Sequence, residues 1–243
     1  MGFGRAGPDE PFDAVHWDEI TQFTVGRMLR HTIRASKRGE GAHAVRFMGR
    51  RGLDTYMVPG VHIVPVEPAG ALPKTGFRLF EDESGRQLLC TVLPDGSDRY
   101  RVTDGGGRDI GSVRRTPLTK RLTQRGWWMR QPGHPAVVAP RNWAKGGMGA
   151  AVGRGVGHVV EGAVDSLLSF GADETSGSEK GLKPVVWARE EPDGQYGEAV
   201  LTFPRGAGSE RWYFVKRDGW LDKRLAFALA VLRESETIGA GKR

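Results

Sequence analysis

Short apolar runs, many alternating with polar residues and bounded by glycine or proline, fill most of the chain from Ala44 onward. Examples are AVRFMG, LDTYMVPG and VHIVPVEP near the start, and PVVWAREEPDGQYGEAVLTF over 184–203. Such runs are typical of antiparallel strands, and they predict about a dozen short strands and a mainly β protein. Residues 17–38 fit two interpretations, a loosely amphipathic helix or two strands around Gly26.

A repeated unit lies in the middle of the chain. FRLFEDESGRQLL (77–89) and YRVTDGGGRDIGS (100–112) align, and each reads as strand, acidic-glycine turn, strand. Aspartate and glycine suit such turns because they tolerate positive φ at low cost. PDGSD (94–98) is a further turn between the copies, so 77–115 predicts a four-stranded antiparallel meander. The glycines of DGGGRDIG are expected to shape a hairpin, because a phosphate loop needs Gly-x4-Gly-Lys-Ser/Thr.

Two segments depart from the strand pattern. The end of the chain holds eight consecutive apolar residues (225–232) after Asp222, which predicts a capped helix over 222–235. A helix that is apolar on every side must be buried on every side or lie in lipid. Eight residues span only about 12 Å, so we expect a protein enclosure such as a barrel. Residues 145–181 are rich in Gly, Ala and Ser and predict a helical insertion, with an amphipathic helix over 157–170 for packing or self-association.

The repeated unit and the terminal helix together resemble the Tubby C-terminal-like superfamily, which includes the plant LURP-one-related proteins and the phospholipid scramblases. The matching residues are 77–88, 100–110 and the helix preceded by Asp222, Lys223 and Arg224. The resemblance implies a closed or nearly closed antiparallel β-barrel of about 12 strands around a buried C-terminal helix. It would cover 44–243, with residues 1–43 as a lead-in of uncertain structure.

Positive charge is clustered along the chain, whose net charge is +7. Residues 99–145 hold eleven Lys and Arg against two acids, and residues 27–51 hold eight against Glu40. Clusters of this kind attract phosphate-bearing partners. Because the resembled family implies contact with anionic headgroups, the candidate ligand-binding residues are Arg114, Arg115, Lys120, Arg121 and Arg125.

Strand alternation divides these candidates and the neighbouring tryptophans. Arg115 is expected to share a face with Val113, and Arg114 to lie on the opposite face unless a bulge or strand end intervenes. Of the pair Trp127 and Trp128, one is expected in the core and the other at the surface, where an indole can contact a base or a lipid interface.

The sequence favours binding over catalysis. The single cysteine, Cys90, excludes an intramolecular disulfide and multi-cysteine metal sites, and its apolar run predicts a small buried side chain. The six histidines have no metal-ligand or catalytic spacing, and no Gly-x-Ser-x-Gly motif occurs. We therefore expect no metal, no cofactor and no enzymatic activity.

The expected function is that of an intracellular module that binds anionic, phosphoinositide-like headgroups or a protein partner. The alternatives are a nucleic-acid-binding β module that uses the basic 99–130 strands, and an enzyme with an unrecognised site. No apolar run reaches the length of about 18 residues that a membrane-spanning helix needs, and the N-terminus lacks a signal-peptide pattern. The expected location is cytoplasmic, peripheral to the membrane in the lipid-binding case, and the oligomeric state is left open.

Overall fold

The computed structural model describes residues 15–32, 35–51, 54–67, 74–120, 124, 126–140, 184–204, 211–217 and 219–240. The expected insertion at 145–181, its helix over 157–170, and the first fourteen residues of the lead-in lie outside this part of the chain.

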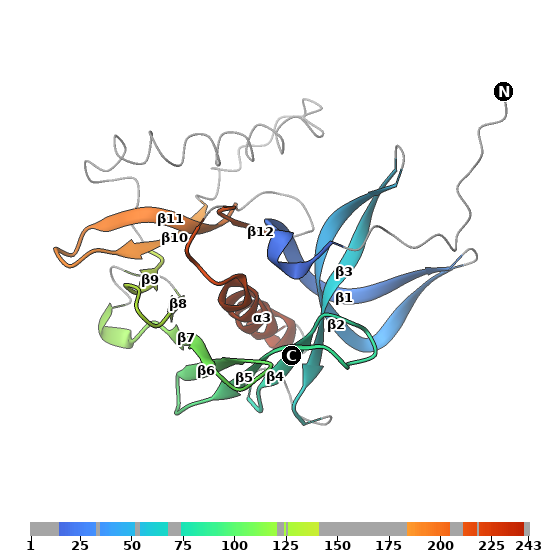
Figure 1. Cartoon of the computed structure of the whole chain (residues 1–243), viewed down its shortest axis with the longest axis horizontal. Helices are drawn as coiled ribbons and strands as arrows, with labels where there is room; N and C mark the ends of the chain where they lie inside the picture. The colour runs from blue at the N-terminus through green and yellow to red at the C-terminus, as the bar shows by residue number, and fades with distance from the viewer. Residues whose placement is uncertain are drawn as a thin grey trace.

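Twelve strands and one α-helix make up most of the described residues (Figure 1). In the first half the strands are β1 (Gln22–Thr32), β2 (Ala35–Arg51), β3 (Asp54–Pro65), β4 (Phe77–Phe80), β5 (Leu88–Pro94) and β6 (Arg99–Asp104). The second half contains β7 (Asp109–Arg115), β8 (Trp127–Arg130), β9 (Val137–Val138), β10 (Val185–Glu190), β11 (Tyr196–Phe203) and β12 (Trp212–Val215). Two short 3-10 turns, η1 (Trp17–Glu19) and η2 (Leu118–Lys120), and the helix α3 (Lys223–Ala240) complete the fold.

The strands form a closed antiparallel barrel in which each strand pairs with its neighbours in sequence. Closure comes from β1 and β12, where Gln22 pairs with Phe214 and Thr24 with Trp212. The predicted mainly β fold, a closed twelve-strand barrel with a helix at its centre, is confirmed.

The barrel begins earlier in the chain than the sequence predicts. The expected boundary at residue 44 falls inside β2, and β1 is a full member of the wall. The helical interpretation of 17–38 is wrong. The segment holds β1 and the start of β2, as in the two-strand interpretation, but β1 runs through Gly26 and the second strand begins only at Ala35. Packing of Phe23 helps to place β1 in the wall. Its ring is buried and stacks on the ring of Tyr213 in β12, with 5.3 Å between the centroids, where β1 and β12 close the barrel.

The predicted meander over 77–115 is confirmed as β4, β5, β6 and β7, paired in order. The turns in its two copies are held by the same kind of hydrogen bond, from backbone N–H groups to an aspartate carboxylate. The Asp104 carboxylate accepts the backbone N–H groups of Gly106 (3.0 Å) and Arg108 (2.8 Å), and Gly107 has φ +86°. In the first copy, Asp82 accepts backbone N–H groups in the same way, and the glycine at the corresponding place has φ +69°. The glycines therefore shape hairpins, as expected.

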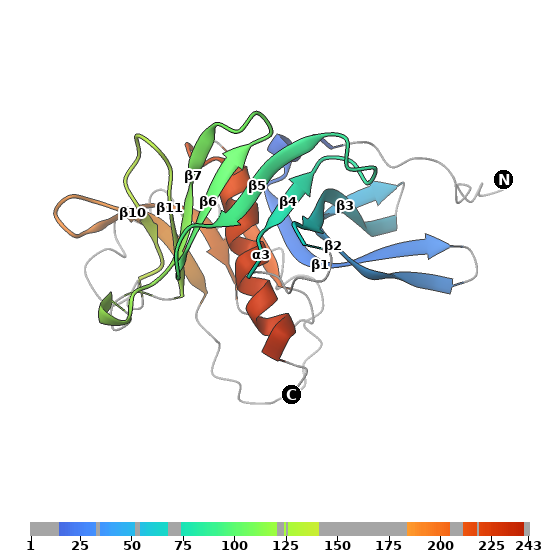
Figure 2. The ribbon, with the colours of Figure 1, turned by 90° about the horizontal axis from the view of Figure 1, so that it is seen from below.

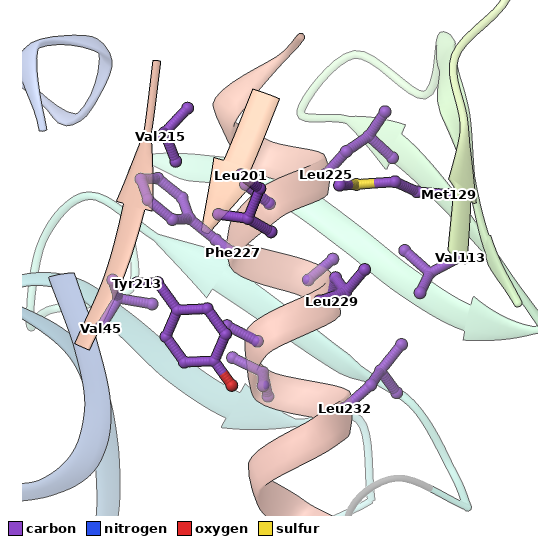
Figure 3. Packing of buried hydrophobic residues seen from close by; sticks show 14 of the residues in the cluster. Val45, Val113, Met129, Leu201, Tyr213, Val215, Leu225, Phe227, Leu229 and Leu232 are labelled. Atoms are coloured by element: carbon purple, nitrogen blue, oxygen red, sulfur yellow. The ribbon is translucent and has the colours of Figure 1, made fainter. Parts of the chain in front are cut away.

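Helix α3 runs through the barrel interior (Figure 2). All eight residues of 225–232 are 0–2% exposed, because side chains from the whole wall surround them. Phe227 meets the ring of Phe23 edge-on at 4.9 Å, and Leu225 points toward Met129 of β8 (Figure 3). The backbone N–H of Arg224 donates to the Asp222 carboxylate at 2.9 Å, which confirms the expected cap. The helix continues to Ala240, five residues beyond the expected end.

Cys90 belongs to the same core. Its side chain is fully buried, and this burial raises the pKa of the thiol well above its ordinary value. The expectation of a small buried side chain is confirmed, and the thiol stays protonated at neutral pH.

Candidate binding groove

A groove with a volume of about 270 Å³ lies against the outer face of β8, β9 and β10. Its walls come from three separate parts of the chain: the segment between β7 and β8, the β8–β9 hairpin, and β10. The lining residues are Pro117, Lys120, Gln124, Trp128, Arg130, His134, Pro135, Ala136, Val138 and Glu190.

Alternation along β8 places the groove outside the barrel. Trp127 and Met129 are buried in the core, whereas Trp128 is half-buried and Arg130 is exposed. The Trp127 carbonyl accepts the indole N–H of Trp187 at 2.8 Å, which fixes the inner side of this strand. The expected division of the tryptophan pair is confirmed, and the outer indole forms part of the groove wall.

The base of the groove is polar. Gln124 is buried, and its side-chain amide donates to the Glu190 carboxylate at 3.2 Å across 66 residues of sequence. Its backbone N–H donates to the carbonyl of Lys120 at 2.9 Å, which holds the end of η2 against the wall. The Glu190 carboxylate therefore accepts a hydrogen bond from Gln124 and can accept others, since a carboxylate can accept about four hydrogen bonds.

Cations lie around this base. Lys120, in η2, and Arg130, on β8, are both exposed groove residues. Arg114 sits directly opposite Trp128 in the β7–β8 register, with its guanidinium carbon 5.4 Å from the indole centroid. This distance is within cation–π range. Within the described part of the chain, Arg114 Nε is buried and has no hydrogen-bond partner.

The structure therefore separates the predicted ligand-binding residues. Lys120 lines the groove, and Arg114 stacks on one of its walls. Arg115 pairs with Trp127 instead and is exposed because it is the last residue of β7, where the inner face of the wall opens to solvent. Arg121 and Arg125 lie outside the described residues.

Sequence reasoning missed several groove residues. Arg130 carries a local signal, because it lies two positions after Trp128 on the same strand face. Gln124, His134 and Glu190 carry no such signal, since they meet only through tertiary structure.

His134 connects the groove to the central helix. Its imidazole stacks on Trp220 at 4.4 Å and 7° between planes. In the same loop, Gln131 donates to the Trp220 carbonyl at 3.2 Å and accepts the backbone N–H of Asp222 at 2.8 Å. The groove wall is thus held by the residues that immediately precede α3.

Other site types have less support in the structure. No group of three or more His, Cys, Asp or Glu side chains within the described ranges is placed to hold a metal ion. None of the helices in that part of the molecule is long and apolar enough to cross a lipid bilayer. Comparison of the chain with protein-family models, curated proteins and solved structures finds no match.

Proposed function

We propose that the protein is a non-enzymatic binding module whose groove takes the phosphorylated headgroup of an anionic, phosphoinositide-like lipid. The observation that carries this proposal is the gathering of Arg114, Lys120 and Arg130 around the half-buried indole of Trp128. Guanidinium and ammonium groups are the usual partners of phosphate oxygens. An indole with one apolar side and one wet edge suits a membrane interface.

The dimensions favour a compact headgroup. Pockets for drug-sized ligands span roughly 300–1,000 Å³, and this groove, at about 270 Å³, is slightly smaller. We assign phosphate recognition to Lys120 and Arg130. Arg114 supplies further positive charge from its stack on Trp128. Glu190 offers acceptor positions to ring hydroxyls, as an inositol has, while Gln124 keeps the carboxylate in place.

The nucleic-acid alternative through residues 99–130 is less well supported, because acids neutralise much of its charge. Arg99 pairs with Asp95 at 3.0 Å, and Arg108 pairs with Asp104 at 3.1 Å. Arg101 lies 3.8 Å from a carboxylate oxygen of the neighbouring strand. These pairs lower the net positive charge that a phosphate backbone would meet on β6 and its turns.

The assignment to the Tubby C-terminal-like superfamily stays a prediction. The closed barrel around a C-terminal helix is the fold that the resemblance implies, and this agreement is what supports the superfamily assignment.

The test is sedimentation with phosphatidylcholine liposomes that contain or lack a phosphorylated phosphatidylinositol. The groove variant carries Lys120→Gln and Arg130→Gln. The matched control carries Arg86→Gln and Arg101→Gln, which remove the same charge from exposed positions elsewhere. Two lost charge-assisted hydrogen bonds cost about 3 kcal/mol, or about 100-fold in affinity.

We expect that loss for the groove variant and a change of no more than about threefold for the control. Equal losses in both variants would show that net charge, and not the groove, binds the membrane. No phosphoinositide-dependent sedimentation of the wild-type protein would refute the lipid form of the proposal.

A further inference from the structure

A carboxylate without an ion-pair partner lies at the base of the candidate groove. Glu190 is half-buried, and its side chain accepts a hydrogen bond from the amide of Gln124 at 3.2 Å. No lysine or arginine among the described residues forms an ion pair with this carboxylate. The next acid along the chain differs, because the Arg189 guanidinium donates to the Glu191 carboxylate at 2.6 Å and neutralises it. The negative charge of Glu190 is therefore available to a ligand.

The Glu190 side chain is held in place from two sides. Its backbone N–H donates to the carbonyl of Ala136 at 2.8 Å, which ties this end of β10 to the β8–β9 hairpin. Gln124, which holds the carboxylate, is only 4% exposed. Hydrogen bonds of this kind fix the orientation of a side chain before a ligand arrives. The carboxylate therefore stays directed at the same part of the groove when a headgroup enters.

The groove combines this negative base with positive charge around it. Lys120 and Arg130 are exposed residues of its lining, and the structure does not pair either of them with Glu190. A ligand that satisfies both features carries a phosphate for the cations and uncharged hydrogen-bond donors for the carboxylate. Ring hydroxyls next to a phosphate are donors of this kind, whereas a second phosphate in their place is an acceptor.

We propose that the groove selects headgroups whose ring phosphate lies beside an unphosphorylated hydroxyl, and that Glu190 rejects a second, adjacent phosphate. This inference rests on the proposed function and adds the number of phosphates that the ligand carries. A phosphate monoester has a charge of about −1.5 to −2 at pH 7, so a carboxylate beside it is repelled. The groove volume of about 270 Å³ acts in the same direction, because it leaves little room for the ring to move away from Glu190.

The size of the discrimination follows from Coulomb's law. Consider a phosphate with about 1.5 negative charges at about 6 Å from a carboxylate, with an effective dielectric constant of about 40, between the values for a protein surface and for water. Such a phosphate is bound about 30-fold more weakly than a neutral hydroxyl at the same position. Attraction of the second phosphate to the surrounding cations offsets part of this effect, so we expect a net preference of about 10- to 30-fold.

Isothermal titration calorimetry on the full chain tests the proposal. The probes are water-soluble dibutanoyl forms of the three phosphatidylinositol monophosphates and of the 3,4- and 4,5-bisphosphates, whose ring phosphates are adjacent. Inorganic phosphate is titrated separately. Glu190→Gln keeps the side-chain length and an acceptor for Gln124 but removes the charge. The matched control is Glu191→Gln, which removes the same charge from the acid that Arg189 neutralises. The melting temperature of each protein shows that the barrel is folded.

We expect the wild-type protein and the Glu191→Gln control to bind at least one monophosphate about 10- to 30-fold more tightly than either bisphosphate. The Glu190→Gln variant should lose or reverse this preference, because its groove keeps the cations without the opposing charge.

An affinity of the wild-type protein that rises with the second phosphate would overturn this inference and leave the lipid proposal standing. So would a preference for monophosphates that Glu190→Gln leaves unchanged. Inorganic phosphate that binds as tightly as the monophosphates would also overturn the inference, since the ring hydroxyls would then make no favourable contact with Glu190. No binding of any of these lipids would overturn it together with the proposed ligand of the groove.

Discussion

Substitution of Gly111 with alanine should destabilise the barrel far more than the same substitution at Gly107. Both glycines lie in the second repeated unit, and both have positive φ, +143° and +86°. They differ in the space around them. A Cβ at residue 111 would lie in hard contact with the backbone carbonyl of Arg130 and within 3.0–3.2 Å of the Leu225 methyl groups. A Cβ at residue 107 would have nothing within 4 Å.

The magnitudes follow from this difference. At Gly107 alanine introduces only backbone strain, which costs about 1–2 kcal/mol. At Gly111 a similar strain adds to overpacking, worth about 1–3 kcal/mol, against a carbonyl that belongs to the β7–β8 ladder. We expect a loss of about 2–5 kcal/mol for Gly111→Ala, a large share of the 5–15 kcal/mol by which domains are stable.

Urea unfolding followed by tryptophan fluorescence measures both variants. With a slope of about 2–3 kcal/mol per molar urea, the urea midpoint should fall by about 1–2 M for Gly111→Ala and by less than about 1 M for Gly107→Ala. Adding Leu225→Ala should not rescue the first variant, because the Arg130 carbonyl remains. Equal midpoints for the two single variants would refute the reasoning that close approach, and not φ alone, requires glycine in β7.

Three further substitutions test the core and the turns. Leu229→Ala, at the fully buried centre of α3, should cost about 2–5 kcal/mol in urea unfolding, and a loss below 1 kcal/mol would contradict the enclosure of the helix. Tyr213→Phe removes a hydroxyl that donates to the buried Glu234 carboxylate at 2.6 Å, so calorimetry should show a loss of about 1–3 kcal/mol. Asp82→Asn should lower stability at neutral pH. The Ser84 hydroxyl and two backbone amides hold the pKa of Asp82 at about 2, below its ordinary 3.8. Its contribution is thus present above pH 4 and lost as the pH falls through 2, so the melting temperatures of wild type and variant should converge over that range; a constant difference would speak against this linkage.

The meander and the terminal helix could be predicted because their determinants are local. Asp82 and Asp104 each organise a turn with amides at most five residues away, and no distant contact is needed. The eight apolar residues of α3 require enclosure whatever the wall is made of. Alternation alone also predicted that Trp127 and Trp128 would divide between the inner and outer faces of β8.

Only the tertiary structure decided how the barrel closes and where the groove lies. β1 joins β12 through backbone hydrogen bonds between residues about 190 positions apart. Backbone pairing of this kind does not depend on a side-chain pattern, so neither segment's sequence indicates its partner. The groove depends on Gln124 meeting Glu190. The exposure of Arg115 depends on β7 ending at that residue, where alternation no longer assigns a side chain to the interior. Local chemistry therefore determines the turns, the helix and the strand faces, whereas contacts between distant segments determine the seam and the candidate site.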